Sequence, residues 1–170
     1  MTVLDWLLDS DPAIRWQVMH DLLDAPAVDI AAERANVATE GWGVELLAQQ
    51  RPDGSWAGVA FSQDYDSTMH VLTLLRLFGL DPSSPQAEHA VAAVRDRVVW
   101  PGWGPNGTDN PYFIGEVEPC INGQVAAAGA YFRQDVSALI DRLLTEQLDD
   151  GGWNCEVENG STRSSPRTSP

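Results

Sequence analysis

The sequence predicts an all-α protein built from stacked α-hairpin repeats. Apolar residues recur at helical spacing through most of the 170 residues, and no segment shows the alternation of a convincing strand. A Gly–Trp turn also recurs after two helical segments. The composition is that of a globular protein, with 44% hydrophobic and 21% charged residues. The length suits one domain with a substantial core.

The first 40 residues predict a helical N-terminal cap. Asp11-Pro12 places a capping residue before a proline at the first helical position, and Pro26 closes that helix. A second helical stretch covers about 27–38. Neither stretch carries the repeated turn, and an array of repeats requires a distinct end cap. We therefore assign residues 1–40 to this cap.

Residues 41–160 predict the repeats themselves. The segment 67–78 is apolar nearly all round, which indicates a buried helix, and 122–132 resembles it with smaller residues. Between them, residues 101–119 are rich in Gly, Pro and Asn and predict a long loop. The expected helices, in chain order, cover about 43–50, 67–78, 84–98, 122–132 and 136–148.

The repeat is visible when the chain is aligned with itself. Four residues of the first turn recur 97 positions later in the second: Gln50, Asp53, Gly54 and Trp56 match Gln147, Asp150, Gly151 and Trp153. Half of that spacing gives a unit of about 48 residues and predicts a degenerate copy near position 104, where Trp103 stands between two glycines. Hairpins of this length stack into an open solenoid or a closed ring of two helix layers.

The turn has a physical logic. A glutamine at the end of one helix can donate hydrogen bonds to backbone groups near a neighbouring helix end, which lack partners within their own helix. An indole ring can pack over that glutamine. An Asp-Gly pair supplies the positive φ that returns the indole to the helix it follows. We expect the tryptophans to join adjacent hairpins rather than to stack on a ligand.

The pattern Leu-x-x-x-Gln-x-x-x-Gly-x-Trp, at Leu46–Trp56 and Leu143–Trp153, resembles the glutamine–tryptophan repeat of the squalene–hopene and oxidosqualene cyclases. These belong to the terpenoid cyclase and protein prenyltransferase superfamily. The resemblance covers about residues 40–160 and implies a partial α/α toroid. It also implies an ancestral activity, the acid-initiated cyclisation of an isoprenoid, which we expect to be lost in this chain.

The resemblance implies three candidate catalytic residues. Family cyclases protonate an alkene with an Asp-x-Asp-Asp acid at the start of an inner helix, and Asp64-Tyr65-Asp66-Ser67 stands at that place. Asp66 would be the acid, Asp64 its partner carboxylate and His70 an orienting group. Ser67 replaces the last aspartate of the motif. The alternatives are that residues 66–68 cap the helix and that His70 is an ordinary core residue.

We expect no cofactor and no metal. Prenyltransferases of the superfamily hold zinc through an Asp-x-Cys pair and a later histidine, whereas Asp150 and Cys155 lie too far apart in sequence and no histidine follows His89. Cys120 and Cys155 match no metal spacing and are expected to be reduced thiols. A site formed by both cysteines and His70 is the remaining zinc alternative.

Two carboxylates of the long loop, Glu116 and Glu118, offer another pair of alternatives. They directly precede Pro119-Cys120, where an inner helix is expected to begin. They could rim the mouth of a cavity, but solvated loop charges are the more ordinary interpretation.

The charge limits the partners. The chain has 25 acidic residues against 10 basic ones, all arginine, for a net charge of −15. Nucleic acids and anionic membranes need a basic face, so both are excluded as expected partners. No apolar run approaches the roughly 20 residues of a membrane span. The N-terminus lacks the pattern of a signal peptide, and we expect a cytoplasmic protein.

The last ten residues contain only Ser, Thr, Arg and Pro. By the repeat logic an inner helix should begin there, but this composition cannot form one. We therefore interpret 161–170 as a disordered or aberrant tail, as a truncation or frameshift would produce. The open end of the array would expose apolar surface, which predicts a homodimer or a covering partner.

Three functions remain open. The first is isoprenoid cyclisation by ancestry. The second is a non-catalytic helical repeat module that binds a lipid-like ligand or a protein partner. The third, a carbohydrate-active (α/α)-barrel enzyme, fits the acidity but not the glutamine–tryptophan spacing.

Overall fold

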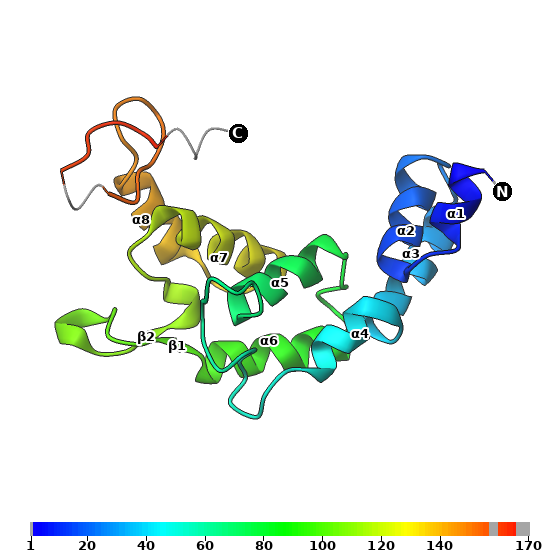
Figure 1. The fold of residues 1–170 in the computed structure, drawn as a ribbon, viewed down its shortest axis with the longest axis horizontal. Coiled ribbons are helices and arrows are strands. Elements are labelled where there is room, and N and C mark those ends of the chain that lie inside the picture. The colour runs from blue at the N-terminus through cyan, green and yellow to red at the C-terminus, as the bar shows by residue number, and fades with distance from the viewer. Residues whose placement is uncertain (1, 157–159, 166–170) are drawn as a thin grey trace. The chain divides into compact units, whose positions relative to one another are not determined.

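The computed structural model describes residues 2–156 and 160–165 and is predominantly helical, as the sequence predicts (Figure 1). The chain divides into two compact units, Met1–Val94 and Arg95–Pro170. The α-helices are α1 (Val3–Leu8), α2 (Pro12–Asp21), α3 (Ala27–Ala35), α4 (Gly41–Ala48), α5 (Thr68–Leu77), α6 (Pro85–Arg97), α7 (Pro119–Tyr131) and α8 (Ser137–Thr145).

The N-terminal helices begin where local capping favours them. Asp11 is the N-cap of α2, and its Oδ1 accepts from the Ala13 N–H at 2.8 Å, which confirms the predicted start. One helix was not predicted. Thr2 and Asp5 form a reciprocal capping box that starts α1, with bonds of 2.7 and 3.1 Å.

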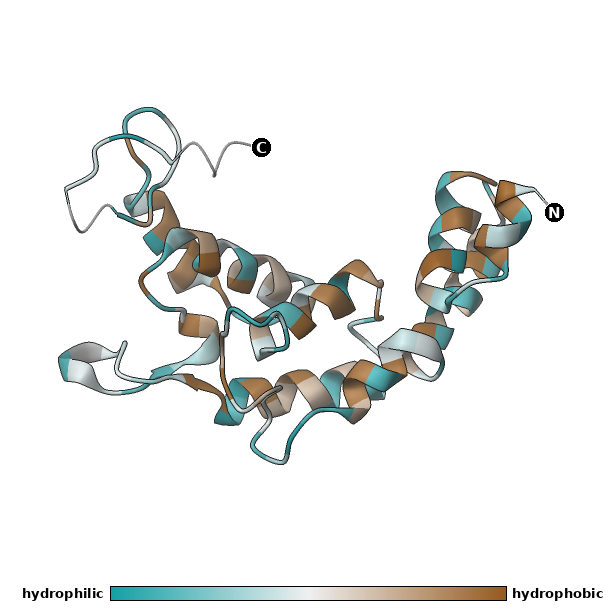
Figure 2. Cartoon of the chain, in the orientation of Figure 1, coloured by the Kyte–Doolittle hydropathy of each residue, from teal (hydrophilic) through white to brown (hydrophobic). Residues whose placement is uncertain are grey.

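The core of the first unit lies along one side of α5. Met69, Leu72 and Leu75 are almost fully buried there. Leu74 and Leu77 of the same helix are exposed, so the expectation of a helix buried all round holds for one face only. Figure 2 shows apolar and polar residues alternating along the helices, as expected where one stripe of each helix packs inward.

The second unit contains the helices α7 and α8, which pack against each other, and a two-stranded sheet. Strand β1 (Val99–Trp100) pairs antiparallel with β2 (Asn110–Pro111). The predicted loop 101–119 therefore contains some regular secondary structure: β2 and the short 3₁₀ helices η2 (Pro105–Gly107) and η3 (Tyr112–Ile114).

The tail is described only in part. The peptide N–H of Ser165 donates to the Trp153 carbonyl at 2.9 Å, and that of Ser164 donates to Asp150 Oδ2 at 2.8 Å. The expectation for 166–170 lies outside the described residues. Within the described part of the chain, no helix has both the length and the apolar character needed to cross a membrane.

Candidate functional site

The first Gly–Trp turn ties the end of α4 to α6. Gln50 Nε2 donates to the carbonyl of Gly54 in its own turn and to that of Ala90 in α6, both at 2.9 Å. The buried Trp56 donates its indole N–H at 2.7 Å to the Leu46 carbonyl in the last turn of α4, and this carbonyl also accepts the Gln49 peptide N–H at 3.2 Å. Gly54 has φ +83°, the positive φ predicted for this turn.

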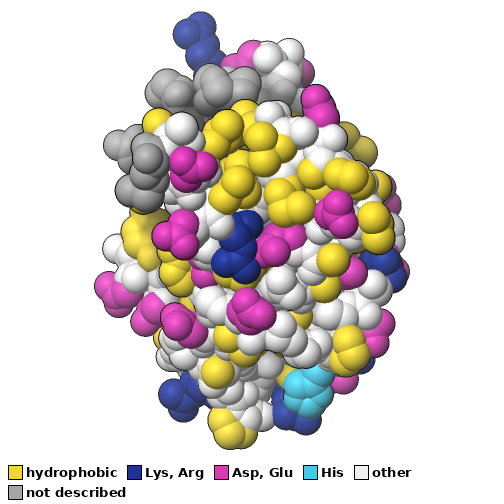
Figure 3. Space-filling model, turned by 90° about the vertical axis from the view of Figure 1, so that its right-hand side faces the viewer, with side chains coloured by type: hydrophobic (Ala, Val, Ile, Leu, Met, Phe, Trp, Pro, Cys, Tyr) yellow, Lys and Arg dark blue, Asp and Glu magenta, His cyan; other side chains and the backbone are white. Residues whose placement is uncertain are grey.

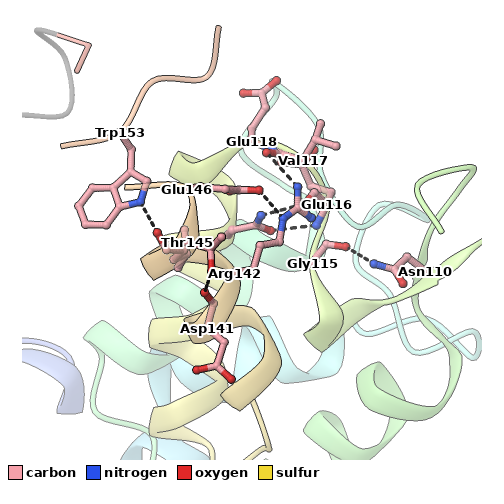
Figure 4. Close-up of polar contacts among 12 residues, drawn as sticks. Asn110, Gly115, Glu116, Val117, Glu118, Asp141, Arg142, Thr145, Glu146 and Trp153 are labelled. Carbon is pink, nitrogen blue, oxygen red and sulfur yellow. Dashed lines mark hydrogen bonds and ion pairs between the residues drawn. The ribbon is translucent and has the colours of Figure 1, made fainter. Parts of the chain in front are cut away.

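The second turn repeats this geometry in the other unit. Gln147 Nε2 donates to the Gly151 carbonyl at 2.7 Å. The Trp153 indole, drawn in Figure 4, donates to the Leu143 carbonyl of α8 at 2.7 Å. Gly151 has φ +86°. Both bonds span the same number of residues as in the first turn. The sequence motif thus corresponds to one recurring local structure.

The degenerate copy differs. Trp103 is 51% exposed, whereas Trp100, three residues earlier, is buried. The Trp100 indole stacks on the Tyr112 ring and donates to the Tyr112 carbonyl at 2.9 Å. A tryptophan therefore stabilises this segment as well, but through the β1–β2 hairpin and not through the preceding helix.

Asp64 and Asp66 lie in the turn before α5, and both are exposed. Ser62 Oγ joins them, because it donates to Asp66 Oδ1 at 2.9 Å and accepts from the Asp64 peptide N–H at 3.3 Å. Neither carboxylate is enclosed by apolar side chains in this arrangement. The structure thus leaves both carboxylates in water, and the link through Ser62 reaches the peptide of Asp64 and not its carboxylate.

His70 lies one turn into α5 beside this pair. Its Nδ1 is 2.9 Å from Ser67 Oγ, and its ring lies 5.5 Å from the Phe61 ring and 4.8 Å from the Tyr65 ring, measured between centroids. Partial burial lowers the pKa of His70, while the negative charge of Asp66 opposes that shift. The predicted residues 64, 66 and 70 therefore form one local group.

The start of α5 depends on Thr68, one of the three residues that the sequence offers as a helix cap. Thr68 is fully buried, and its Oγ1 donates to the Val59 carbonyl at 2.8 Å and accepts from the Trp56 peptide N–H at 3.1 Å. The side chain of Ser67, the N-cap residue, makes no capping bond. The side chain of Thr68 therefore links the Gly–Trp turn to α5, and the predicted cap by Ser67 is absent.

The loop before α7 is held by a polar network around Glu116 (Figure 4). Arg142 of α8 donates to the carbonyls of Glu116 and Val117 and pairs with Glu146 at 2.7 Å. Asn122 Nδ2 also donates to the Glu116 carbonyl, at 2.8 Å. The Glu116 residue is 4% exposed, and burial raises the pKa of its carboxyl group. The expectation of a solvated charge is wrong for this residue.

Next to this network lie the two cysteines of the zinc alternative, grouped with Glu118 and not with the His70 that the sequence suggested. Glu118 caps α7, Cys120 follows in its first turn, and Cys155 comes two residues after Trp153. Cys155 Sγ donates to Cys120 Sγ at 3.2 Å, and Cys120 Sγ donates to Glu118 Oε2 at 3.6 Å. Burial of the thiol, together with Cys155 and Glu118, raises the pKa of Cys120. The two cysteines are 35 positions apart, so no local sequence pattern joins them to Glu118.

Comparison with family models, with curated proteins and with solved structures finds no match for this chain. Any function must therefore be argued from the residues and contacts described above.

Proposed function

We propose that this chain is a helical repeat protein of the terpenoid cyclase and prenyltransferase type, which binds an apolar isoprenoid chain without protonating it. The observation that carries the proposal is the pair of Gly–Trp turns with the same two hydrogen bonds, from Gln50 and Trp56 and from Gln147 and Trp153. Such a recurrence supports a repeat architecture, and the resemblance of the motif is what points to the α/α-toroid kind.

Exposure of the candidate acid favours binding over catalysis. A carboxylic acid that protonates an alkene must be kept protonated, which requires an apolar enclosure or a closely paired carboxylate. Asp66 is exposed and accepts a hydrogen bond from Ser62, so it lacks an apolar enclosure. The chain would then retain the binding role of its relatives and not their chemistry.

An apolar surface suited to such a ligand is present on α5. Leu74 and Leu77 are exposed on this helix, and Phe61 is exposed in the segment before it. Figure 3 shows hydrophobic side chains exposed among acidic ones on one face of the molecule. An uncharged hydrocarbon is not repelled by a chain of net charge −15, whereas a diphosphate ester would be.

The test is equilibrium binding of a fluorescent polyprenyl alcohol to the purified chain, with squalene as competitor. We expect saturable binding. Leu74→Gln and Leu77→Gln together should weaken it about tenfold, since each removes an apolar contact with the bound ligand that contributes about 1 kcal/mol or less. Val28→Gln on α3, which is also exposed, is the matched control and should leave binding unchanged. Absence of saturable binding would overturn the proposal.

Acid-initiated cyclisation is the second candidate. It is favoured by the grouping of Asp64, Asp66 and His70 at the start of one helix. Incubation with squalene and shorter polyenes, followed by product analysis, separates the two functions. A cyclic product that Asp66→Asn abolishes would support the cyclase, and binding without turnover would support the binding protein.

A further inference from the structure

We propose that Glu118, Cys120 and Cys155 form a binding site for a single thiophilic divalent cation of the zinc class. This inference goes beyond the proposed function and does not depend on it. The site lies within the second unit, at the point where the N-terminus of α7 meets the segment that follows the second Gly–Trp turn.

The distances fit a tetrahedral ion. The two Sγ atoms and a carboxylate oxygen all lie within 4.8 Å of one another. Two sulfur ligands at about 2.3 Å from zinc and at tetrahedral angles are roughly 3.7 Å apart. The separation between Cys120 Sγ and Glu118 Oε2 is 3.6 Å, and the two sulfurs are 3.2 Å apart, so they need to open by only about 0.5 Å.

The scaffold holds the donors from two independent elements. Pro119 in the first turn of α7 fixes the spacing of Glu118 and Cys120, and the Glu118 carbonyl accepts from two peptide N–H groups of that turn. Trp153 is anchored on α8 through its indole, which sets the direction of the chain two residues before Cys155. The donors are therefore brought together by packing that does not involve the ion.

The chemistry selects the class of cation. Two thiolates and a carboxylate carry three negative charges, which would repel one another unless a cation lies between them. Thiolate ligands favour zinc and similar soft ions over magnesium and calcium, which prefer oxygen donors. Three protein ligands leave the fourth tetrahedral position to water or to a small ligand, the pattern of zinc sites that act on a ligand. Cys120 and Glu118 are exposed, so that position can be reached from solvent.

The test uses the full chain, reduced and freed of metal by a chelator, then titrated with Zn²⁺ against a chromophoric competitor and with Co²⁺ as a spectroscopic probe. We expect one ion per chain and a thiolate-to-cobalt charge-transfer band with the intense visible bands of a tetrahedral site. Cys120→Ser and Cys155→Ser should each weaken binding at least tenfold, and Glu118→Gln about tenfold. Asp141→Asn, an exposed carboxylate on α8, is the matched control and should bind normally.

A second measurement does not depend on the variants' folding. In the wild-type chain, Zn²⁺ should protect both thiols from alkylation, as counted by intact mass. Binding of less than one ion per chain, unchanged affinity in both Cys→Ser variants, or thiols alkylated equally fast with and without Zn²⁺ would each overturn the site. Rapid oxidation of the reduced, metal-free protein to a Cys120–Cys155 disulfide that Zn²⁺ does not prevent would show a redox pair instead.

Discussion

At the scale of single residues, the two turn glycines carry different constraints although they occupy the same place in the repeat. Both have a positive φ, +83° at Gly54 and +86° at Gly151. A Cβ atom built on Gly54 would lie 2.4 Å from the Ala93 carbonyl oxygen, while one on Gly151 meets nothing within 4 Å. The first glycine is therefore required both by its φ and by the close approach of α6, the second by φ alone.

This contrast gives a matched pair of substitutions. Gly151→Ala should lower the free energy of unfolding by about 1 kcal/mol, the cost of an alanine at positive φ. Gly54→Ala adds a clash with backbone that cannot move aside, so we expect a loss of about 3 kcal/mol or more. Urea unfolding monitored by circular dichroism measures both. Equal losses would show that the α6 backbone yields freely.

His70 should make stability depend on pH. Its pKa is lowered from 6.5 in the folded protein, so the unfolded chain binds the proton more readily. The stabilisation linked to His70 is complete above about pH 6.5 and is lost as the pH falls through the lowered pKa. His70→Gln should flatten this part of the stability profile, measured by urea unfolding between pH 8 and 5.

Magnetic resonance provides a direct check on the same residue. The imidazole of His70 should titrate with a midpoint below 6.5, and Asp66→Asn should lower the midpoint further because the attraction to the carboxylate is lost. His89→Gln, at an exposed position of α6, is the control for the stability profile and should leave its slope intact. A His70 midpoint above 6.5 would contradict the assigned effect of burial.

At the scale of elements, the glutamines show how strongly each turn is joined to its surroundings. Gln50 bonds its own turn and the Ala90 carbonyl of α6, and it is partly buried. Gln147 bonds the Gly151 carbonyl from an exposed position. We expect Gln50→Ala to cost about 1–2 kcal/mol of unfolding free energy and Gln147→Ala about 0.5 kcal/mol. Urea unfolding of both variants measures these losses. A larger loss for Gln147→Ala than for Gln50→Ala would show that the bond from Gln50 to α6 does not stabilise the protein.

Elements with strong local signals could be predicted from the sequence. The start of α2 at Asp11-Pro12 and the turns at Gly54 and Gly151 follow from side chains that act on their own backbone. The pair β1–β2 has two residues in each strand, too few to show alternation, so the sequence predicts a loop there. The helix α1 was missed although its capping box, Thr2 with Asp5, is legible in sequence.

The candidate site likewise has features that the sequence could predict and features that it could not. Asp64, Asp66 and His70 lie close together because they are neighbours in the chain, and their grouping could be foreseen. The exposure of the two carboxylates could not, because it depends on how the turn before α5 packs in the folded chain. The contact between Cys120 and Cys155 joins residues 35 positions apart and arises only when α7 and α8 pack together. No local pattern encodes such a contact.

At the scale of the whole molecule, the excess of acidic side chains is the dominant electrostatic feature. The net charge is −15, and several ion pairs in the described residues join two exposed side chains, such as Arg51 with Asp53 and Arg95 with Asp96. Exposed pairs of this kind contribute little. Repulsion among carboxylates should therefore outweigh attraction and oppose the compact state at low ionic strength.

Added salt should consequently stabilise the protein. Raising NaCl from about 0.01 M to about 0.15 M shortens the Debye length from about 30 Å to about 8 Å and screens the repulsion. We expect the free energy of unfolding in urea to rise by the order of 1 kcal/mol. The measurement is made with a chelator present, so that a bound divalent cation does not imitate screening. Asp64→Asn combined with Asp141→Asn, both exposed, should raise stability at low salt and reduce the salt effect. If the free energy of unfolding instead falls as salt is added, attraction between charged pairs outweighs repulsion among carboxylates. The acidic side chains would then act mainly in specific ion pairs and not as a solvated surface.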